Sequence, residues 1–114
     1  MRYDFVVIGG TGIQGRIAAR DLLQNGYSVL LTGRDKTRVY DILKRYKRSR
    51  FAILDLREKR HITRLIKKSG SRIVINCADG DFDLDIYKAC LEENANCLDL
   101  GSDPYWMNDA QFAL

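Results

Sequence analysis

The stretch FVVIGGTGIQGRIAARDLLQNGYSVLLTGRDK, residues 5–36, decides the fold. It opens with an apolar run and passes through a cluster of glycines. A segment with helical spacing of apolar residues follows, and a second apolar run closes the stretch. Asn25-Gly26 stands where such a helix would stop, because glycine takes the left-handed conformation that ends many helices. The stretch therefore predicts a strand, a helix and a second strand.

The same alternation continues along the chain. Short runs rich in Val, Ile and Leu occupy residues 3–9, 27–32, 50–55, 72–78 and 95–101, and amphipathic segments occupy residues 13–25, 36–48, 58–69 and 83–94. The apolar runs do not alternate with polar residues, which is typical of strands buried on both faces of a sheet. The pattern predicts the α/β class and one domain, residues 1–114. Its expected core is a Rossmann-type doubly wound parallel sheet of about five strands in the order 3-2-1-4-5, with helices on both faces.

The composition favours a folded globular domain over a disordered, membrane-spanning or disulfide-rich protein. The chain has 114 residues, of which 46% are hydrophobic and 30% charged, as in a folded globular domain. No apolar run approaches the roughly 20 residues that span a membrane, and the N-terminus does not read as a secretion signal. Three cysteines, Cys77, Cys90 and Cys97, form no Cys-x-x-Cys pair, which argues against a disulfide framework or a zinc site. We expect a cytoplasmic protein with no membrane partner.

Charge is distributed unevenly. Residues 1–75 hold 18 of the 19 Lys and Arg residues, whereas residues 76–114 hold 9 of the 15 Asp and Glu residues. This asymmetry predicts an anion site on the first part, contact between the two parts, or only solvated helix faces. The segment KRYKRSR, residues 44–50, combines basic residues with an aromatic one, a pattern found in nucleic-acid-binding proteins. A solvated helix end and attraction for a phosphate account for it, so we expect no nucleic-acid partner.

The glycine cluster fits a dinucleotide-binding motif. Residues 10–15 read G-x-G-x-x-G between a predicted strand and a predicted helix, the context that the motif requires. Gly10 would permit a tight turn, Gly12 would let a pyrophosphate approach the backbone, and Gly15 would let the helix pack on the sheet. Gly9 opens a second register, G-x-x-G-x-x-G, and the sequence leaves both open. The predicted pyrophosphate-binding residues are Gly10, Thr11, Gly12, Ile13, Gln14 and Gly15, at a helix N-terminus with free N–H groups.

The end of the second predicted strand favours NADP(H) over NAD(H). NAD-binding folds usually place Asp or Glu there to bond the ribose 2′-hydroxyl, but this chain has Thr32, Gly33 and Arg34. A guanidinium holds a 2′-phosphate through two parallel hydrogen bonds, whereas a carboxylate would repel it. These three residues are therefore predicted to contact the adenosine end of NADP. Asp35 has two interpretations: an N-cap for the next helix, or a displaced ribose ligand.

Two further strand ends carry candidate cofactor-binding residues. Asp55 and Leu56 follow the third predicted strand, where such folds line the adenine pocket, although Asp55 fits a cap or turn equally well. Asn76, Cys77 and Ala78 end the fourth strand at the switch point. There the backbone and the Asn76 side chain would meet the ribose or nicotinamide end of the cofactor. No base is placed to activate Cys77, so we predict no catalytic residue in this chain.

The acidic segment DGDFDLD, residues 79–85, has the Asp spacing of a calcium loop. Leu84 and Cys90 stand where that loop requires Gly and a bidentate Glu, so we predict helix capping and no metal site.

Several segments together resemble the NADP-binding domain of the saccharopine dehydrogenase (saccharopine reductase-like) family. Residues 74–78 (VINCA) match its Asn-(Ala/Cys)-Ala turn, residues 88–92 (KACLE) its Ala-Cys-Leu-Glu helix core, and residues 98–101 (LDLG) its strand ending in Asp-Leu. The opening VVIGGTGIQGR resembles the family's glycine turn, and the likeness spans residues 3–105. One departure is residues 79–82, which replace a Pro followed by Phe or Tyr.

The resemblance implies nucleotide-dependent oxidoreduction of amino-acid-derived substrates, with NADP as cofactor. It implies that this chain is the N-terminal part of a longer protein, whose second domain binds substrate and often forms a homodimer. By the same resemblance Gly10, Gly12 and Gly15 line the pyrophosphate, Arg34 the 2′-phosphate, and residues 76–78 the far ribose. No acid/base pair is evident, so we expect this chain alone to be inactive. The alternative is a non-catalytic module that senses NAD(P)H.

Overall fold

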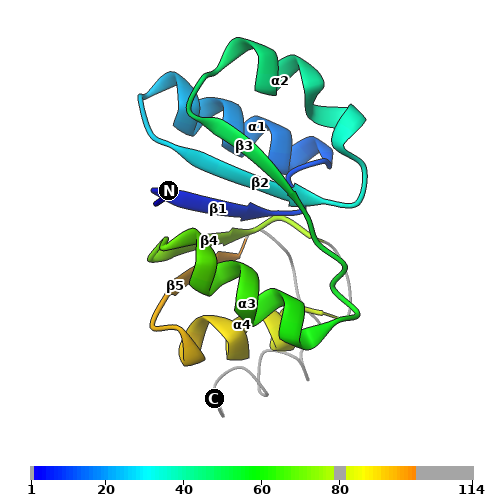
Figure 1. Cartoon of the computed structure of the whole chain (residues 1–114), viewed down its shortest axis with the longest axis vertical. Coiled ribbons are helices and arrows are strands. Elements are labelled where there is room, and N and C mark those ends of the chain that lie inside the picture. Colours follow the sequence, from blue (N-terminus) through cyan, green and yellow to red (C-terminus); the bar gives the residue numbers. More distant parts are fainter. Residues whose placement is uncertain (1, 79–81, 100–114) are drawn as a thin grey trace.

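The computed structural model describes residues 2–78 and 82–99. They form one five-stranded parallel sheet in the order β3-β2-β1-β4-β5, which confirms the predicted architecture (Figure 1). The elements are β1 (Phe5–Ile8), α1 (Ile13–Gln24), β2 (Val29–Gly33), the 3₁₀ helix η1 (Lys36–Val39), α2 (Tyr40–Arg45), β3 (Ser49–Ile53), α3 (Lys59–Ser69), β4 (Ile73–Asn76), α4 (Asp83–Glu92) and β5 (Asn96–Asp99). The last two residues of the fifth predicted strand, Leu100 and Gly101, lie outside the described ranges.

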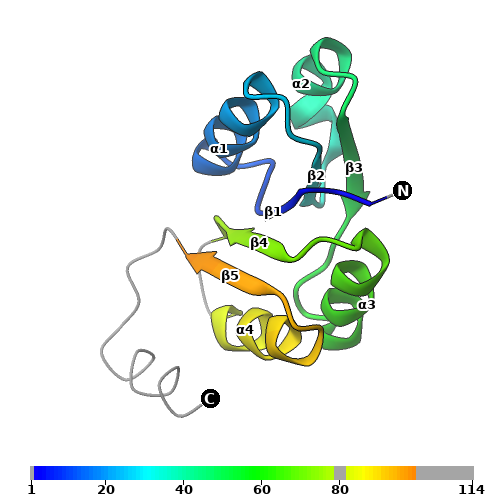
Figure 2. The same ribbon diagram turned by 90° about the vertical axis from the view of Figure 1, so that its left-hand side faces the viewer.

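Helices cover both faces of the sheet. Figure 2 shows α1 and α2 above the strands and α3 and α4 below them. Side chains of successive strand residues point to opposite faces, so β1 contributes to two cores. Val6 and Ile8 pack with α3 and α4, whereas Val7 packs with α1, η1 and α2. All three are almost completely buried, which explains why the strand reads as an unbroken apolar run.

The order of the strands places a switch point beside β1. β1 pairs with β2 on one side, through Val6 and Leu30, and with β4 on the other, through Val6 and Val74. The connection that follows β1 runs toward β2, and the chain returns to the other side of β1 only after β3. Crevices at the carboxyl ends of such strands are where doubly wound folds bind ligands.

The second predicted helix differs from the expectation of one helix over residues 36–48. It divides into η1 and a short α2 that ends at Arg45. Asp35 caps η1 by accepting a hydrogen bond from the Thr37 backbone N–H, and a tight i to i+3 turn follows, with the Arg38 N–H donating to the Asp35 carbonyl. Val39, at φ −121° and ψ 13°, then interrupts helical geometry. Sequence periodicity does not distinguish a 3₁₀ turn from an α-turn at this length.

The predicted stop of α1 is confirmed, because the helix ends before Asn25-Gly26. The helix α3 ends at Ser69, the last residue of the predicted segment 58–69, and Gly70, with a φ of 65°, follows it as the C-cap. No helix among the described residues is long and apolar enough to cross a membrane.

Candidate functional site

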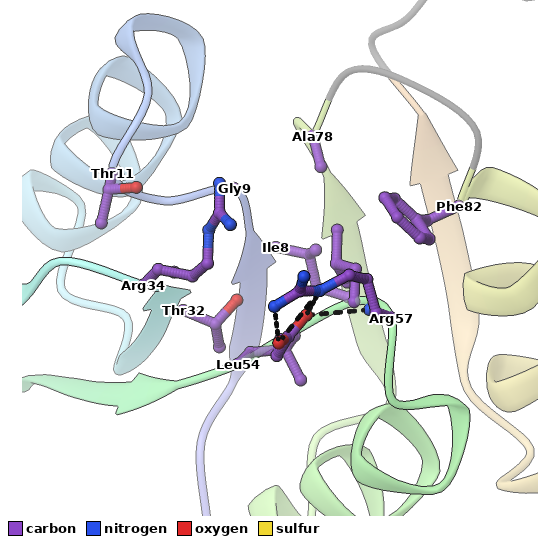
Figure 3. A pocket seen from close by; sticks show the side chains of 12 residues that line it. Ile8, Gly9, Thr11, Thr32, Arg34, Leu54, Arg57, Ala78 and Phe82 are labelled. Atoms are coloured by element: carbon purple, nitrogen blue, oxygen red, sulfur yellow. Dashed lines mark hydrogen bonds and ion pairs between the residues drawn. The ribbon is translucent and has the colours of Figure 1, made fainter.

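A pocket of about 280 Å³ lies at the carboxyl edge of the sheet, beside the switch point. Figure 3 shows it from close by. Its walls come from the ends of the first four strands and from the residue before α4. The lining residues are Ile8, Gly9, Thr11, Thr32, Gly33, Arg34, Leu54, Asp55, Leu56, Arg57, Ala78 and Phe82.

The turn after β1 depends on Gly9. This residue has a φ of 78°, which only glycine adopts readily. A Cβ atom on Gly9 would also lie 2.7 Å from the backbone N of Ala78, so a side chain would collide with the end of β4. Gly10 does not have a positive φ, but a Cβ there would lie 3.1 Å from the Leu31 Cβ, so the chain is also tightly packed at this residue. The positive φ lies at Gly9, the first glycine of the second register, Gly9-x-x-Gly12-x-x-Gly15.

Gly15 brings the start of α1 against this turn. A Cβ atom there would lie 2.1 Å from the Gly9 carbonyl oxygen and 2.8 Å from the Gly10 Cα. The Arg16 N–H donates to the Gly12 carbonyl, which begins the helical hydrogen bonds. The N–H groups of residues 13–15 precede that bond and have no acceptor within the helix. No acidic residue lies in the first turn of α1, so its N-terminus keeps its partial positive charge for an anion.

The end of β2 contributes a buried hydroxyl and a free cation. Thr32 is fully buried and donates its hydroxyl to the Val7 carbonyl at 3.0 Å, which ties β2 to β1 below the pocket. Gly33 leaves room for the Thr11 side chain, whose Cγ2 would lie 2.6 Å from a Cβ at that position. Arg34 is exposed, and none of the described residues forms a hydrogen bond or ion pair with its guanidinium. That group is therefore available to a ligand.

Asp35 acts as a cap, which confirms one of its two interpretations. Its Oδ1 accepts hydrogen bonds from the Thr37 N–H at 3.0 Å and from the Thr37 hydroxyl at 2.5 Å. These bonds from Thr37 hold the pKa of the Asp35 carboxyl below its usual value. One oxygen of the carboxylate, Oδ1, is thereby engaged at the start of η1.

Asp55 and Arg57 form an ion pair at the end of β3. Arg57 Nη2 lies 2.7 Å from Asp55 Oδ2, Nε donates to both carboxylate oxygens, and the Arg57 backbone N–H donates to Oδ1 at 3.0 Å. The pKa of the Asp55 carboxyl is lowered to about 2, chiefly by the hydrogen bonds from Arg57, and the charge of Arg34 contributes to this shift. The cap-or-turn interpretation of Asp55 is thus confirmed. The residue also lines the pocket, as its adenine-site prediction requires.

The end of β4 is organised by Asn76. This side chain is fully buried, its amide donates to Asp83 at 2.8 Å, and its carbonyl oxygen accepts from the Ala78 N–H at 3.1 Å. We predicted that the side chain would meet the cofactor. Because protein groups occupy its amide and carbonyl, only the backbone of this turn is left to do so. Burial raises the pKa of the Cys77 thiol, which disfavours the nucleophilic thiolate.

The structure divides the predicted site residues into two groups. Those that line the pocket are Thr11, Thr32, Gly33, Arg34, Asp55, Leu56 and Ala78; those that do not are Gly10, Gly12, Ile13, Gln14, Gly15, Asn76 and Cys77. Sequence reasoning missed Ile8, Leu54, Arg57 and Phe82 as pocket residues. Ile8 and Leu54 could have been predicted as pocket residues because they lie at strand ends. Arg57 could have been predicted because it lies two residues after Asp55, where it can form an ion pair with that carboxylate. Nothing local to Phe82 marks it, since it reaches the pocket from the start of α4.

The acidic segment forms protein contacts where it is described. Asp83 bonds Asn76, and Asp85 lies 3.6 Å from Lys59 of α3. Asp79 and Asp81 lie outside the described ranges. Among residues 2–78 and 82–99 no three His, Cys, Asp or Glu side chains are grouped so that they could hold a metal ion.

Comparisons with solved structures show what this fold is similar to. An NAD(P)-binding domain of an exopolyphosphatase-related protein from Archaeoglobus fulgidus has a TM-score of 0.73 and 24% identity over 98% of this chain and 83% of its own. Serine dehydrogenase from Escherichia coli has a TM-score of 0.73 and 19% identity over 96% of this chain and 69% of its own. UDP-glucose-4-epimerase from Stenotrophomonas maltophila, solved with bound NAD, has a TM-score of 0.75 and 16% identity over 86% of this chain.

The chain spans about a third of that epimerase, 36% of its length. These low identities establish the Rossmann-like fold alone. No curated protein matches the chain. A family model for the saccharopine dehydrogenase NADP binding domain matches residues 5–114, almost the whole sequence, as the resemblance led us to expect. The chain therefore belongs to the saccharopine dehydrogenase NADP binding domain family.

Proposed function

We propose that this chain binds NADP(H) and serves as the cofactor domain of an oxidoreductase. The observation that carries the proposal is the free guanidinium of Arg34 beside the glycine turn, in one pocket at the switch point. The N-terminus of α1 offers unbonded N–H groups to a pyrophosphate, and Arg34 offers a two-pronged donor to a 2′-phosphate. Asp35 lies next to Arg34, and one of its carboxylate oxygens, Oδ1, caps η1. The residues present therefore fit the cofactor.

In this proposal the chain binds and orients, and the nicotinamide group supplies hydride transfer. The turn around Gly9 and Ala78 would position the far half of the dinucleotide at the switch point, between β1 and β4. The pocket places few proton-transfer groups there. Asp55 has a pKa of about 2 and remains ionised near neutral pH, and the other charged residues of the lining are Arg34 and Arg57. A proton donor for the substrate would come from another part of the protein.

The properties of the whole protein are part of the proposal. We infer an amino-acid-derived substrate, a second domain that binds it, and a homodimer formed through that domain. Family membership and the fraction of the epimerase that this chain spans support a further domain. The free thiols of Cys77, Cys90 and Cys97 support a reducing, cytoplasmic location.

A second candidate is a regulatory module that senses NAD(P)H without catalysis. The raised pKa of Cys77 and the permanently charged groups of the pocket favour it, because neither can exchange protons with a substrate near neutral pH. Both candidates require the same nucleotide pocket. A coupled enzyme assay of the longer protein separates them, since only the enzyme turns over nucleotide.

Calorimetric titration with NADPH and with NADH tests the pocket. We expect NADPH to bind more tightly, and Arg34→Ala to weaken NADPH roughly ten- to hundredfold by removing charge-assisted hydrogen bonds to phosphate. NADH should change little. The control is Lys44→Ala, which removes one positive charge from exposed α2 outside the pocket. If the native chain bound neither nucleotide, or if both variants lost affinity equally, the proposal would be wrong.

A further inference from the structure

Three charged side chains meet in the pocket. Arg34 comes from the residue after β2, and Asp55 and Arg57 come from the turn after β3, which lies beside β2 in the sheet. Figure 3 shows the side chains of Arg34 and Arg57 in the same pocket. The guanidinium of Arg57 donates hydrogen bonds to the Asp55 carboxylate. With Arg34 and Asp55 alone the group would be neutral. Arg57 makes it net positive.

Asp55 and Arg34 line the same pocket, so the carboxylate acts on the Arg34 guanidinium through its charge. The positive charge of Arg34 contributes to the low pKa of the Asp55 carboxyl, although the two do not form an ion pair. A free carboxylate at this place would draw the Arg34 guanidinium toward itself and repel a phosphate. It would also be an acceptor for a ribose hydroxyl, which is the use that NAD-binding sites make of an acid at the neighbouring strand end.

Arg57 occupies the Asp55 carboxylate on both oxygens. Three side-chain contacts of 2.7–3.2 Å and the backbone N–H of Arg57 hold Oδ1 and Oδ2. Arg34 is left without a hydrogen bond or ion pair among the described residues. The Arg57 side chain is 72% exposed, so the pair stands at the mouth of the pocket, where a ligand can reach it.

We propose that Arg57 is a specificity-determining residue, which holds the Asp55 carboxylate so that Arg34 stays free for the 2′-phosphate of NADP(H). This inference rests on the proposed function and deepens it. Selectivity for the phosphate would then depend on two strand ends. The end of β2 supplies Arg34, which binds the phosphate. The end of β3 supplies Arg57, which neutralises the Asp55 carboxylate that would compete for Arg34.

The test is a double-mutant cycle on nucleotide binding. Arg57→Ala should weaken NADPH about tenfold, because the unpaired carboxylate now competes for Arg34 and repels the phosphate. NADH should stay within about twofold, because it carries no 2′-phosphate. Adding Asp55→Asn to Arg57→Ala removes the competing charge and should return NADPH to within about threefold of the native affinity. Thermal unfolding of each variant checks that the fold is intact.

The matched control is Arg60→Ala, an exposed arginine three residues further along that does not line the pocket. If Arg57→Ala behaved like this control, the inference would be wrong. If the double variant stayed as weak for NADPH as Arg57→Ala while it kept the native affinity for NADH, Arg57 would be touching the phosphate itself, and the shielding role would be overturned. Equal weakening of NADPH and NADH would also overturn it. A native chain that binds neither nucleotide would instead overturn the proposed function on which this inference rests.

Discussion

At the scale of single residues, the site depends on the absence of a side chain at two glycines, Gly9 and Gly15. A side chain on Gly9 would require both a strained φ and a collision with Ala78 of β4. A side chain on Gly15 would collide with the Gly9 carbonyl, so α1 could not start where it does. Gly12 is different, because among the described residues a Cβ there would meet the Gly9 carbonyl oxygen alone, at an ordinary 3.5 Å. We predict that the absence of a side chain at Gly12 serves the approach of a pyrophosphate.

This contrast predicts that two alanine substitutions have opposite signatures. Gly15→Ala should cost about 1–3 kcal/mol of folding stability, because the atoms it meets belong to the backbone and cannot rotate away. Gly12→Ala should change stability by roughly 0.5 kcal/mol or less but weaken nucleotide binding, since the methyl group covers the backbone that a pyrophosphate approaches. Chemical denaturation and calorimetric titration measure the two effects. Equal loss of stability in both variants would contradict this assignment.

At the scale of elements, α1 and α2 are joined across their exposed faces. Asp41 in the first turn of α2 lies 2.8 Å from Arg16 and 3.2 Å from Arg20, both on α1. Arg16 also donates to the Arg38 carbonyl in η1. The contact fastens the pair η1 and α2 to the helix that begins at the glycine turn. The hydrogen bonds from Arg16 hold the pKa of the Asp41 carboxyl below its ordinary value.

Removing this contact should have a pH-dependent effect on stability. A carboxyl whose pKa is lower in the folded protein stabilises the fold above its ordinary pKa of 3.8 and loses that contribution as the pH falls through the folded value. Asp41→Ala should therefore lower the melting temperature slightly at pH 7, and the difference from the native chain should shrink in acid. Asp21→Ala, on the exposed side of α1, is the control. A difference that persists unchanged in strong acid would argue against the ion pair.

At the scale of the whole molecule, the uneven charge has two observed counterparts. The basic first part of the chain contains the Arg34 pocket, and Lys59 of α3 contacts Asp85 of α4, which joins the basic and acidic parts. Of the three expected explanations, contact between the two parts is observed at this ion pair, and an anion site at Arg34 belongs to the proposed function. The positive charges of the basic part create a long-range electrostatic potential that attracts anions.

Because salt screens this electrostatic potential, we expect nucleotide affinity to depend on ionic strength. NADPH affinity should fall more steeply with ionic strength than NADH affinity, because NADPH carries the extra 2′-phosphate charge. Titrations at low and high salt measure the two slopes. Duplex DNA should not displace NADPH. Salt-sensitive duplex binding that NADPH does not compete would instead favour a nucleic-acid partner and count against our expectation.

Features that depend on residues close together in the sequence could be predicted, whereas features that depend on contacts between distant segments could not. The strand order, the helix stops at Gly26 and Gly70 and the placement of the glycine turn were predictable, because they follow from local preferences and from the handedness of parallel crossovers. The division of the second helix at Val39 was not, since 3₁₀ and α-turns share the same short-range pattern. The choice between the two glycine registers also required coordinates, because it depends on how closely Gly9 approaches Ala78.

The class of fold, the position of the glycine turn and the basic residue that follows β2 could all be predicted from the sequence alone. These are properties of contiguous segments, whose periodicity and residue types act over a few positions. Only the tertiary structure decided that Arg57 holds Asp55, that the Asn76 side chain is occupied by Asp83 and Ala78, and that Phe82 joins the pocket. Those facts depend on which strand and helix ends the sheet brings together, and side chains from separate segments compete for the same hydrogen bonds only once it has formed.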